Sequence, residues 1–270
     1  MVDWVQETGR LTDSMAGGII RLLFKKGDRL DVRNYRPITL VNADYKIISK
    51  TIARRMAKVL PELISEDQTC VPGRHISTNI HVLRDVVEYC DGTGTEGALL
   101  FLDQEKCFDR VEHGFIYKVM AKMGYGEIFI KWVRIFYNGV HSRVLINGEM
   151  SDLIQIRRGN RQGDSPSSHI YVMVAEVLAC QVRRNPNIQG IRIAGTEKKI
   201  GGYADDTQLF VGSEASLGHI MSEVRLFERA SGSKLNESKT EGLWLGRWKT
   251  RVDKPHDFTW TNTRVRVLGV

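Results

Sequence analysis

The sequence predicts an α+β fold in which helices pack against a mostly antiparallel sheet. Residues 97–102 (GALLFL) form the continuous apolar run of a strand that is buried on both faces. Asn147-Gly148 marks a hairpin turn, and 44–64 repeats apolar residues every three or four positions, as an amphipathic helix does. Strands and helices alternate without the regular βα rhythm of a doubly wound sheet, which favours an α+β layer.

The remaining elements follow from the same patterns in chain order. The helix at 44–64 has Asn42 or Asp44 as its N-cap. We expect further helices over 77–90, in two segments before Gly139, over 168–184 and over 214–230. We expect strands over 18–24, 142–156 (as a hairpin), 190–194, 200–204, 207–212, 241–246 and 264–270.

Composition bounds the class of protein. A length of 270 residues suggests roughly two units, and 42% hydrophobic with 26% charged residues is ordinary globular composition. No apolar run approaches the roughly 20 residues of a membrane span and no signal-peptide pattern begins the chain, so we expect no membrane partner. The 4 cysteines and 7 histidines lack metal-ligand spacing, which fits an intracellular protein better than a disulfide scaffold or zinc site.

Basic residues gather at the two ends of the chain. Residues 1–60 hold 12 Lys or Arg against 6 Asp or Glu, 61–240 hold 21 against 23, and 241–270 hold 6 against 3. A basic flank is typical of proteins with a polyanionic partner such as nucleic acid. Four cations also recur at every fourth position of the predicted helix at 44–64: Lys46, Lys50, Arg54 and Lys58. This row of cations is either a solvated helix face or a face that contacts phosphate.

Three aspartates stand at strand ends. Asp103 closes the buried strand, and Asp205 and Asp206 interrupt the apolar hairpin about a hundred residues later. If these strands are neighbours, the carboxylates converge and need a cation, because like charges at close range disfavour ionisation. An oxygen-only ligand set suits Mg²⁺, and a pair of ions about 3.5–4 Å apart supports phosphoryl transfer. The alternative is an Asp pair on a solvated turn.

Five blocks of sequence occur in a characteristic order: KKGDRLDVRNYRPITLVNADYKIISK, FLDQEKCFDRVEH, RGNRQGD, YADDTQLF, and SGSKLNESKT with the closing VLGV. From about Ile19 to Val270 the chain resembles the reverse transcriptases of non-LTR (LINE-like) retrotransposons. The resemblance implies a polymerase right hand, with a fingers-like region at 1–96 and a palm-like region at 97–270, and fingers elements interleaved at about 113–160. It also implies that two Mg²⁺ ions, with Mn²⁺ as a possible substitute, bind the catalytic residues Asp103, Asp205 and Asp206.

The same resemblance implies a nucleotide site. Arg36 corresponds to an arginine at the triphosphate, and Phe108 to a ring beneath the sugar that excludes a 2′-hydroxyl. Gln162 and Gly163 match a loop under the nascent base pair, and Lys239 matches a palm lysine near the acidic cluster. By themselves, Phe108 also fits an ordinary core residue and Lys239 a solvated turn.

Primer and template contacts are implied at three further residues. Tyr203 would lie against the primer end, and Lys25 and Lys26 would touch template phosphate, although a simple charged turn explains the two lysines equally well. The expected function is that of an RNA-directed DNA polymerase acting on an RNA template, a DNA primer and dNTPs. We expect it to be intracellular, in the nucleus and cytoplasm if the chain is part of a retrotransposon.

Two departures from the family pattern leave alternatives open. SPSSHIYV follows RQGD, so His169 and Asn160 stand where apolar residues are usual. A catalytically impaired fragment that binds nucleic acid, and a group II intron-type reverse transcriptase, are the alternatives. The family continues past VLGV into a thumb, and no endonuclease domain precedes the chain, so we expect a piece of a longer polypeptide.

Overall fold

The computed structural model describes residues 1–265 and divides into two compact units. Unit 1 combines Met1–Val59 with Phe108–Ile170, and unit 2 combines Leu60–Cys107 with the chain from Tyr171 onward. The division by compactness does not assign roles, so the fingers-like and palm-like boundaries stay predictions. Within the described residues, no helix is long and apolar enough to cross a membrane.

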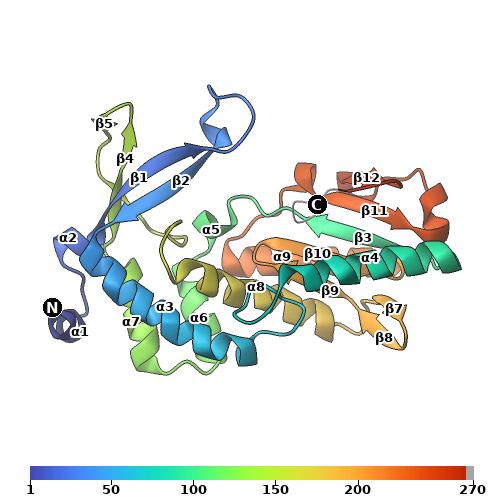
Figure 1. Cartoon of the computed structure of the whole chain (residues 1–270), viewed down its shortest axis with the longest axis horizontal. Helices are drawn as coiled ribbons and strands as arrows, with labels where there is room; N and C mark the ends of the chain where they lie inside the picture. The colour runs from blue at the N-terminus through green and yellow to red at the C-terminus, as the bar shows by residue number, and fades with distance from the viewer. Residues whose placement is uncertain (266–270) are drawn as a thin grey trace. The chain divides into compact units, whose positions relative to one another are not determined.

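Unit 1 contains a five-stranded sheet of order β2-β1-β4-β5, with β6 also paired to β4 (Figure 1). Its strands are β1 (Gly17–Phe24), β2 (Tyr35–Val41), β4 (His141–Ile146), β5 (Glu149–Met150) and β6 (Ile154–Gln155). Its helices are α1 (Val2–Thr8), α2 (Asp13–Ala16), α6 (His113–Lys122) and α7 (Glu127–Tyr137), with the short η1 (Val32–Asn34). Helix α3 (Ala43–Leu63) begins in this unit and α8 (Ser167–Arg184) begins at its end.

The predicted amphipathic helix is α3. The amide of Lys46 bonds the carbonyl of Asn42, which makes Asn42 the N-cap residue. Apolar residues at three- and four-residue steps bury one face, including Tyr45 and Met56, both 0% exposed. The four cations predicted in a row are all exposed, as either interpretation of that row requires.

Unit 2 is built on a second five-stranded sheet of order β12-β11-β3-β10-β9. The strands are β3 (Gly97–Leu102), β9 (Ile200–Tyr203), β10 (Asp206–Val211), β11 (Glu241–Leu245) and β12 (Thr259–Thr261), and a separate hairpin holds β7 (Ile191–Ile193) and β8 (Thr196–Lys198). The helices are α4 (Ile76–Thr93) and α9 (Glu214–Ser231), with η2 (Glu237–Lys239), η3 (Gly246–Thr250) and η4 (Pro255–Asp257). The short helix α5 (Cys107–Arg110) begins with the last residue of this segment and continues in unit 1. All pairings in the five-stranded sheet are antiparallel except β11 with β12.

Strand β3 is covered on both faces, as its apolar run predicts. On one face Leu99 packs with Leu83 and Val86 of α4. On the other, Leu102 lies beside Leu178 of α8 and Phe227 of α9. Alternate side chains of β3 therefore enter two separate apolar layers, and the central strand needs no polar face.

The predicted α+β class with a mostly antiparallel sheet is confirmed. The hairpin at Asn147-Gly148 joins β4 to β5, and α9 ends where Gly232 takes a left-handed conformation with φ +79°. The predicted closing strand at 264–270 falls largely outside the described residues, as does the VLGV block.

Candidate active site

The paired aspartates lie on a tight hairpin in unit 2. Strand β9 ends at Tyr203 and β10 begins at Asp206, and these two residues pair across the turn, which leaves Ala204 and Asp205 as its loop residues. Ala204 has φ +54° although it is not glycine. A side chain in that region costs roughly 1–2 kcal/mol of backbone strain.

The third aspartate is adjacent to this turn in the same sheet. Strands β3 and β10 pair Leu102 with Thr207, so the antiparallel register brings Asp103 beside Asp206 one step further along. Both carboxylates are exposed. The prediction that the two strands are neighbours is therefore confirmed, and the acidic ends of β3 and β10 share one edge of the sheet.

Asp205 has a more enclosed environment than its neighbour. Its Oδ2 accepts a hydrogen bond from the thiol of the buried Cys107 at 3.2 Å. The fully buried Tyr171 lies in the same region, where burial, followed by the charges of Cys107 and Asp205, raises its phenol pKa well above the usual value. Tyr171 therefore stays a neutral hydrogen-bond donor, and its hydroxyl donates to Gln104 at 2.8 Å.

The donor chemistry of this edge fits a divalent cation, because carboxylate oxygens are the ligands that Mg²⁺ prefers. The ligand geometry is a separate matter. Across residues 1–265, no group of three or more His, Cys, Asp or Glu side chains is arranged to hold a metal ion. The assignment of Asp103, Asp205 and Asp206 as metal ligands thus stays a prediction, supported at the level of the backbone by the sheet register.

Lys239 belongs to a segment that is tied to Asp103. The amide of Asn236 donates to the carbonyl of Asp103 at 2.7 Å, and Gln104 forms a bridge with Leu235. Lys239 lies three residues beyond Asn236 in η2 and is exposed. Its chain segment therefore borders the acidic edge, and the assignment of Lys239 to the nucleotide stays a prediction.

In unit 1 the RQGD block forms a loop with two buried anchors. Arg161, 4% exposed, donates to the carbonyl of Ala16 at 2.6 Å. Asp164, 9% exposed, accepts from the Tyr45 hydroxyl at 2.5 Å. Burial is the main reason that the pKa of Asp164 is raised. The two ends of the block are thus structural.

The middle of the loop is more accessible. Gln162 is half-buried and its side-chain amide donates to both carboxylate oxygens of Asp109 at 3.2 Å. Gly163 is exposed with φ +97°, a conformation that other residues rarely adopt. Gln162 and Gly163 are thus the two residues of the RQGD block that are not buried, and they are also the two predicted to lie near the nucleotide.

The other predicted residues of unit 1 are three cations and one phenylalanine. Arg36 is on β2, opposite Leu23, and Lys25 and Lys26 follow β1; all three cations are exposed. Phe108 is half-buried, and its carbonyl accepts from the amide of Asn160 at 2.6 Å. The two exposed lysines fit phosphate contacts or a charged turn equally well.

The two residues that depart from the family pattern, Asn160 in the loop and His169 in α8, have buried polar atoms. Asn160 accepts from the Tyr137 hydroxyl at 3.0 Å, which accounts for a polar residue there, while its amide nitrogen has no partner within residues 1–265. In His169, Nδ1 is likewise buried without a partner in the described part of the chain, and burial lowers the pKa of the ring.

Comparisons with known proteins agree with this geometry. Residues 24–270 match the family model described as reverse transcriptase (RNA-dependent DNA polymerase). The uncharacterized 149 kDa protein of transposon TX1 from Xenopus laevis is 32% identical over 97% of this chain, which spans 20% of that protein. The retrovirus-related Pol polyprotein of the type-1 retrotransposable element R2 from Popillia japonica is 26% identical over 82% of this chain, which spans 31% of that protein.

Solved structures agree at the level of the fold. Telomerase from Candida tropicalis, solved in complex with a TWJ fragment of telomeric RNA, has a TM-score of 0.64 at 13% identity, covering 90% of this chain and 44% of that one. Apo telomerase from the same organism, truncated from its C-terminal domain, has a TM-score of 0.60 at 12% identity, covering 90% of this chain and 54% of that one. The fold is that of right-hand polymerase fingers and palm. With this architecture and the match over nearly its whole length, the chain belongs to the reverse transcriptase (RNA-dependent DNA polymerase) family, on its LINE-like, non-LTR branch.

Proposed function

We propose that this chain copies RNA into DNA by adding deoxynucleotides to the 3′-hydroxyl of a DNA primer on an RNA template. The observation that carries the proposal is the register of β3 and β10, which brings Asp103 beside Asp206 at the same edge as the Asp205 turn. That edge lies inside the segment that matches the reverse transcriptase family. The chain spans a fifth to a third of these two transposon relatives, so the activity of the longer proteins is also proposed here rather than established.

Asp103, Asp205 and Asp206 would hold two Mg²⁺ ions, for which Mn²⁺ is a substitute. When bound, such ions supply Lewis acidity that activates a 3′-hydroxyl and stabilises a leaving pyrophosphate. The protein contributes the orientation of the carboxylates. Tight pairing of β3, β10 and β9 limits the movement of all three backbones, which favours a preorganised site.

We assign five residues to contacts with the nucleotide. Arg36 presents a planar guanidinium with five donors, which suits triphosphate oxygens, and Lys239 borders the acidic edge through its segment. Gln162 and Gly163 would lie beneath the nascent base pair, and Phe108 would exclude a 2′-hydroxyl. For the nucleic acid, we assign Tyr203 to the primer end, and Lys25 and Lys26 to template phosphate.

A primer-extension assay on an RNA template with Mg²⁺ tests the proposal. We expect incorporation by the unmodified protein and loss of incorporation in the double variant Asp205→Asn with Asp206→Asn. Asp85→Asn, an exposed aspartate on α4, is the matched control and should behave as the unmodified protein does. Activity that survives the double variant removes these residues from the catalytic role.

A second candidate function is nucleic-acid binding without catalysis. Within residues 1–265, buried polar atoms of Asn160, next to the RQGD block, and of His169, in α8, have no partner, and this favours it. We test it with RNA binding and dNTP incorporation, under conditions where Asp85→Asn and the unmodified protein are equally folded. Salt-dependent RNA binding without dNTP incorporation selects this alternative.

A further inference from the structure

The turn that carries the paired aspartates is held by a residue from a distant segment. In Gln68, which is 6% exposed, Oε1 accepts from the amide of Ala204 at 2.9 Å. Its Nε2 donates to the carbonyl of the same residue at 3.2 Å. The side-chain amide thus satisfies both backbone groups of a loop residue that the β9–β10 ladder leaves without partners.

The backbone around Gln68 also joins the sheet. Gly202 donates to the carbonyl of Asp67 at 2.9 Å, and Thr69 donates to the carbonyl of Gly202 at 2.8 Å. This parallel bridge places Gln68 opposite Gly202. From α4, Asn79 donates to the same Gly202 carbonyl at 2.7 Å. The segment therefore adds an isolated β-bridge to the edge of the sheet, beside the turn.

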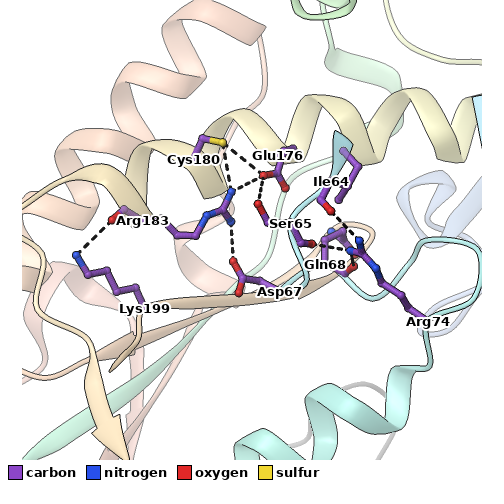
Figure 2. Close-up of polar contacts among 9 residues, drawn as sticks. All are labelled: Ile64, Ser65, Asp67, Gln68, Arg74, Glu176, Cys180, Arg183 and Lys199. Carbon is purple, nitrogen blue, oxygen red and sulfur yellow. Dashed lines mark hydrogen bonds and ion pairs between the residues drawn. The ribbon is translucent and has the colours of Figure 1, made fainter. Parts of the chain in front are cut away.

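Arg74 fixes one end of this segment, as Figure 2 shows. Its guanidinium donates to four backbone carbonyls where α3 ends, at distances of 2.6 to 2.9 Å: those of Pro61, Ile64, Ser65 and Gln68. These include carbonyls that the last turn of a helix leaves unpaired. One side chain therefore ties the helix end to the residue that contacts the turn.

Arg183 fixes the segment from α8 (Figure 2). It donates to Asp67 at 2.6 Å and also to Glu176, which is 3% exposed. Glu176 in turn accepts from the Ser65 hydroxyl at 2.8 Å. The partly buried ion pairs restrict Asp67, and through it the backbone next to Gln68.

We propose that Gln68 is a positioning residue for polymerisation: it holds the strained Ala204 peptide, and with it the carboxylates of Asp205 and Asp206, in the orientation that catalysis needs. Arg74 and Arg183 act through Gln68 by fixing segment 64–74. The effect on catalysis rests on the proposed function, whereas the effect on the turn does not. No element of this assignment was expected from the sequence.

Gly202 provides an independent way to displace the Gln68 amide. A Cβ at Gly202 would lie 3.1 Å from Nε2 of Gln68, which is closer than ordinary van der Waals contact. The next residue provides the control, because a Cβ at Gly201 would lie 3.3 Å from Oε1 of Gln208. Gln208 is 1% exposed, and its amide atoms have no partner in the described part of the chain.

The test compares Gln68→Met with Gln208→Met, since both replace a buried glutamine beside the same hairpin by an apolar residue of similar size. The first measurement is hydrogen exchange in the peptide that contains Ala204, without metal or substrate. We expect exchange at Ala204 to become at least about tenfold faster in Gln68→Met and to stay unchanged in Gln208→Met. Gly202→Ala should resemble Gln68→Met, and Gly201→Ala should not.

The second measurement is primer extension. We expect kcat to fall about tenfold to a hundredfold in Gln68→Met, because small misplacements of reacting groups are costly. The Mg²⁺ concentration for half-maximal rate should rise, a change that a mere loss of folded protein does not cause. Unchanged exchange at Ala204 in both Gln68→Met and Gly202→Ala overturns the proposal, whatever the activity. If the unmodified protein extends no primer, the proposed function fails while the exchange result still decides the role of Gln68.

Discussion

Two hairpin turns of this protein solve the same geometric problem in different ways. The β4–β5 turn has Asn147 at φ +50° and Gly148 at φ +91°, the residue types that such turns favour. The β9–β10 turn has Ala204 at φ +54° and is followed by a carboxylate at each of the next two positions. The first turn is stabilised by its own sequence. The second depends on Gln68, which lies 136 residues away in the chain.

The difference between the two turns indicates that the β9–β10 turn has a functional role. A turn designed only for stability would have glycine at the first loop position, so strain at Ala204 and charge at Asp205 call for another explanation. External hydrogen bonds fix the orientation of Asp205 and Asp206 more firmly than glycine allows, because glycine has more conformational freedom. The comparison predicts that glycine in place of Ala204 does not destabilise the protein, whereas loss of glycine at position 148 does.

The largest expected effect comes from replacing both loop residues of the β9–β10 turn with residue types that hairpin turns favour. Ala204→Gly combined with Asp205→Asn removes the strain and one carboxylate. We expect unfolding in urea to require the same denaturant concentration or a higher one, while primer extension falls about 10²–10³-fold. Ala204→Gly alone is the control and should retain most of the activity. Full activity in the double variant contradicts a catalytic role for Asp205.

A smaller effect is expected from Arg74→Met. The four carbonyls that Arg74 contacts lose a charged donor, so we expect the free energy of unfolding to fall by about 3 kcal/mol. Hydrogen exchange should accelerate at the β9–β10 turn and stay unchanged at the β4–β5 turn. Arg84→Met on α4 is the control, since its ion pair with Glu88 is exposed at 3.8 Å. Equal acceleration at both turns contradicts the assignment.

The self-sufficient turn should be sensitive to its own glycine. Gly148→Ala forces a side chain into the left-handed region, and we expect a loss of about 1–2 kcal/mol in the free energy of unfolding. Polymerisation should remain unaffected. Gly218→Ala in the exposed interior of α9 is the control and should raise stability by roughly 0.5–1 kcal/mol. An unchanged unfolding transition in Gly148→Ala contradicts this account of the turn.

The smallest effect concerns the RQGD loop, which also depends on distant contacts. Burial raises the pKa of Asp164 in the folded state above the ordinary value of 3.8. The folded state is therefore destabilised, relative to the unfolded state, as pH rises from 3.8 through the raised pKa. In Asp164→Asn the amide oxygen still accepts from Tyr45. We expect the variant to be more stable than the unmodified protein at pH 7, and the difference to vanish below about pH 3.8, where both side chains are neutral. Urea unfolding across pH measures it, and a difference that persists at low pH contradicts the explanation.

Much of the fold follows from local patterns. The apolar run of β3, the periodicity of α3 and the Asn147-Gly148 turn each specify an element through interactions within a few residues. The motif order likewise indicated the neighbouring ends of β3 and β10. Gln68 and Cys107 carried no such signal, because a buried glutamine or a scattered cysteine has no sequence pattern that reveals its partner.

The sequence by itself therefore determined the α+β class, the family and the three aspartates at strand ends, since periodicity and motif spacing are local properties of the chain. Only the tertiary structure decided which residues hold those aspartates. The bonds from Gln68 to Ala204 and from Cys107 to Asp205 join positions that are 136 and 98 residues apart. Such contacts exist because the β9–β10 turn leaves backbone groups and a carboxylate that must find partners once they are withdrawn from water.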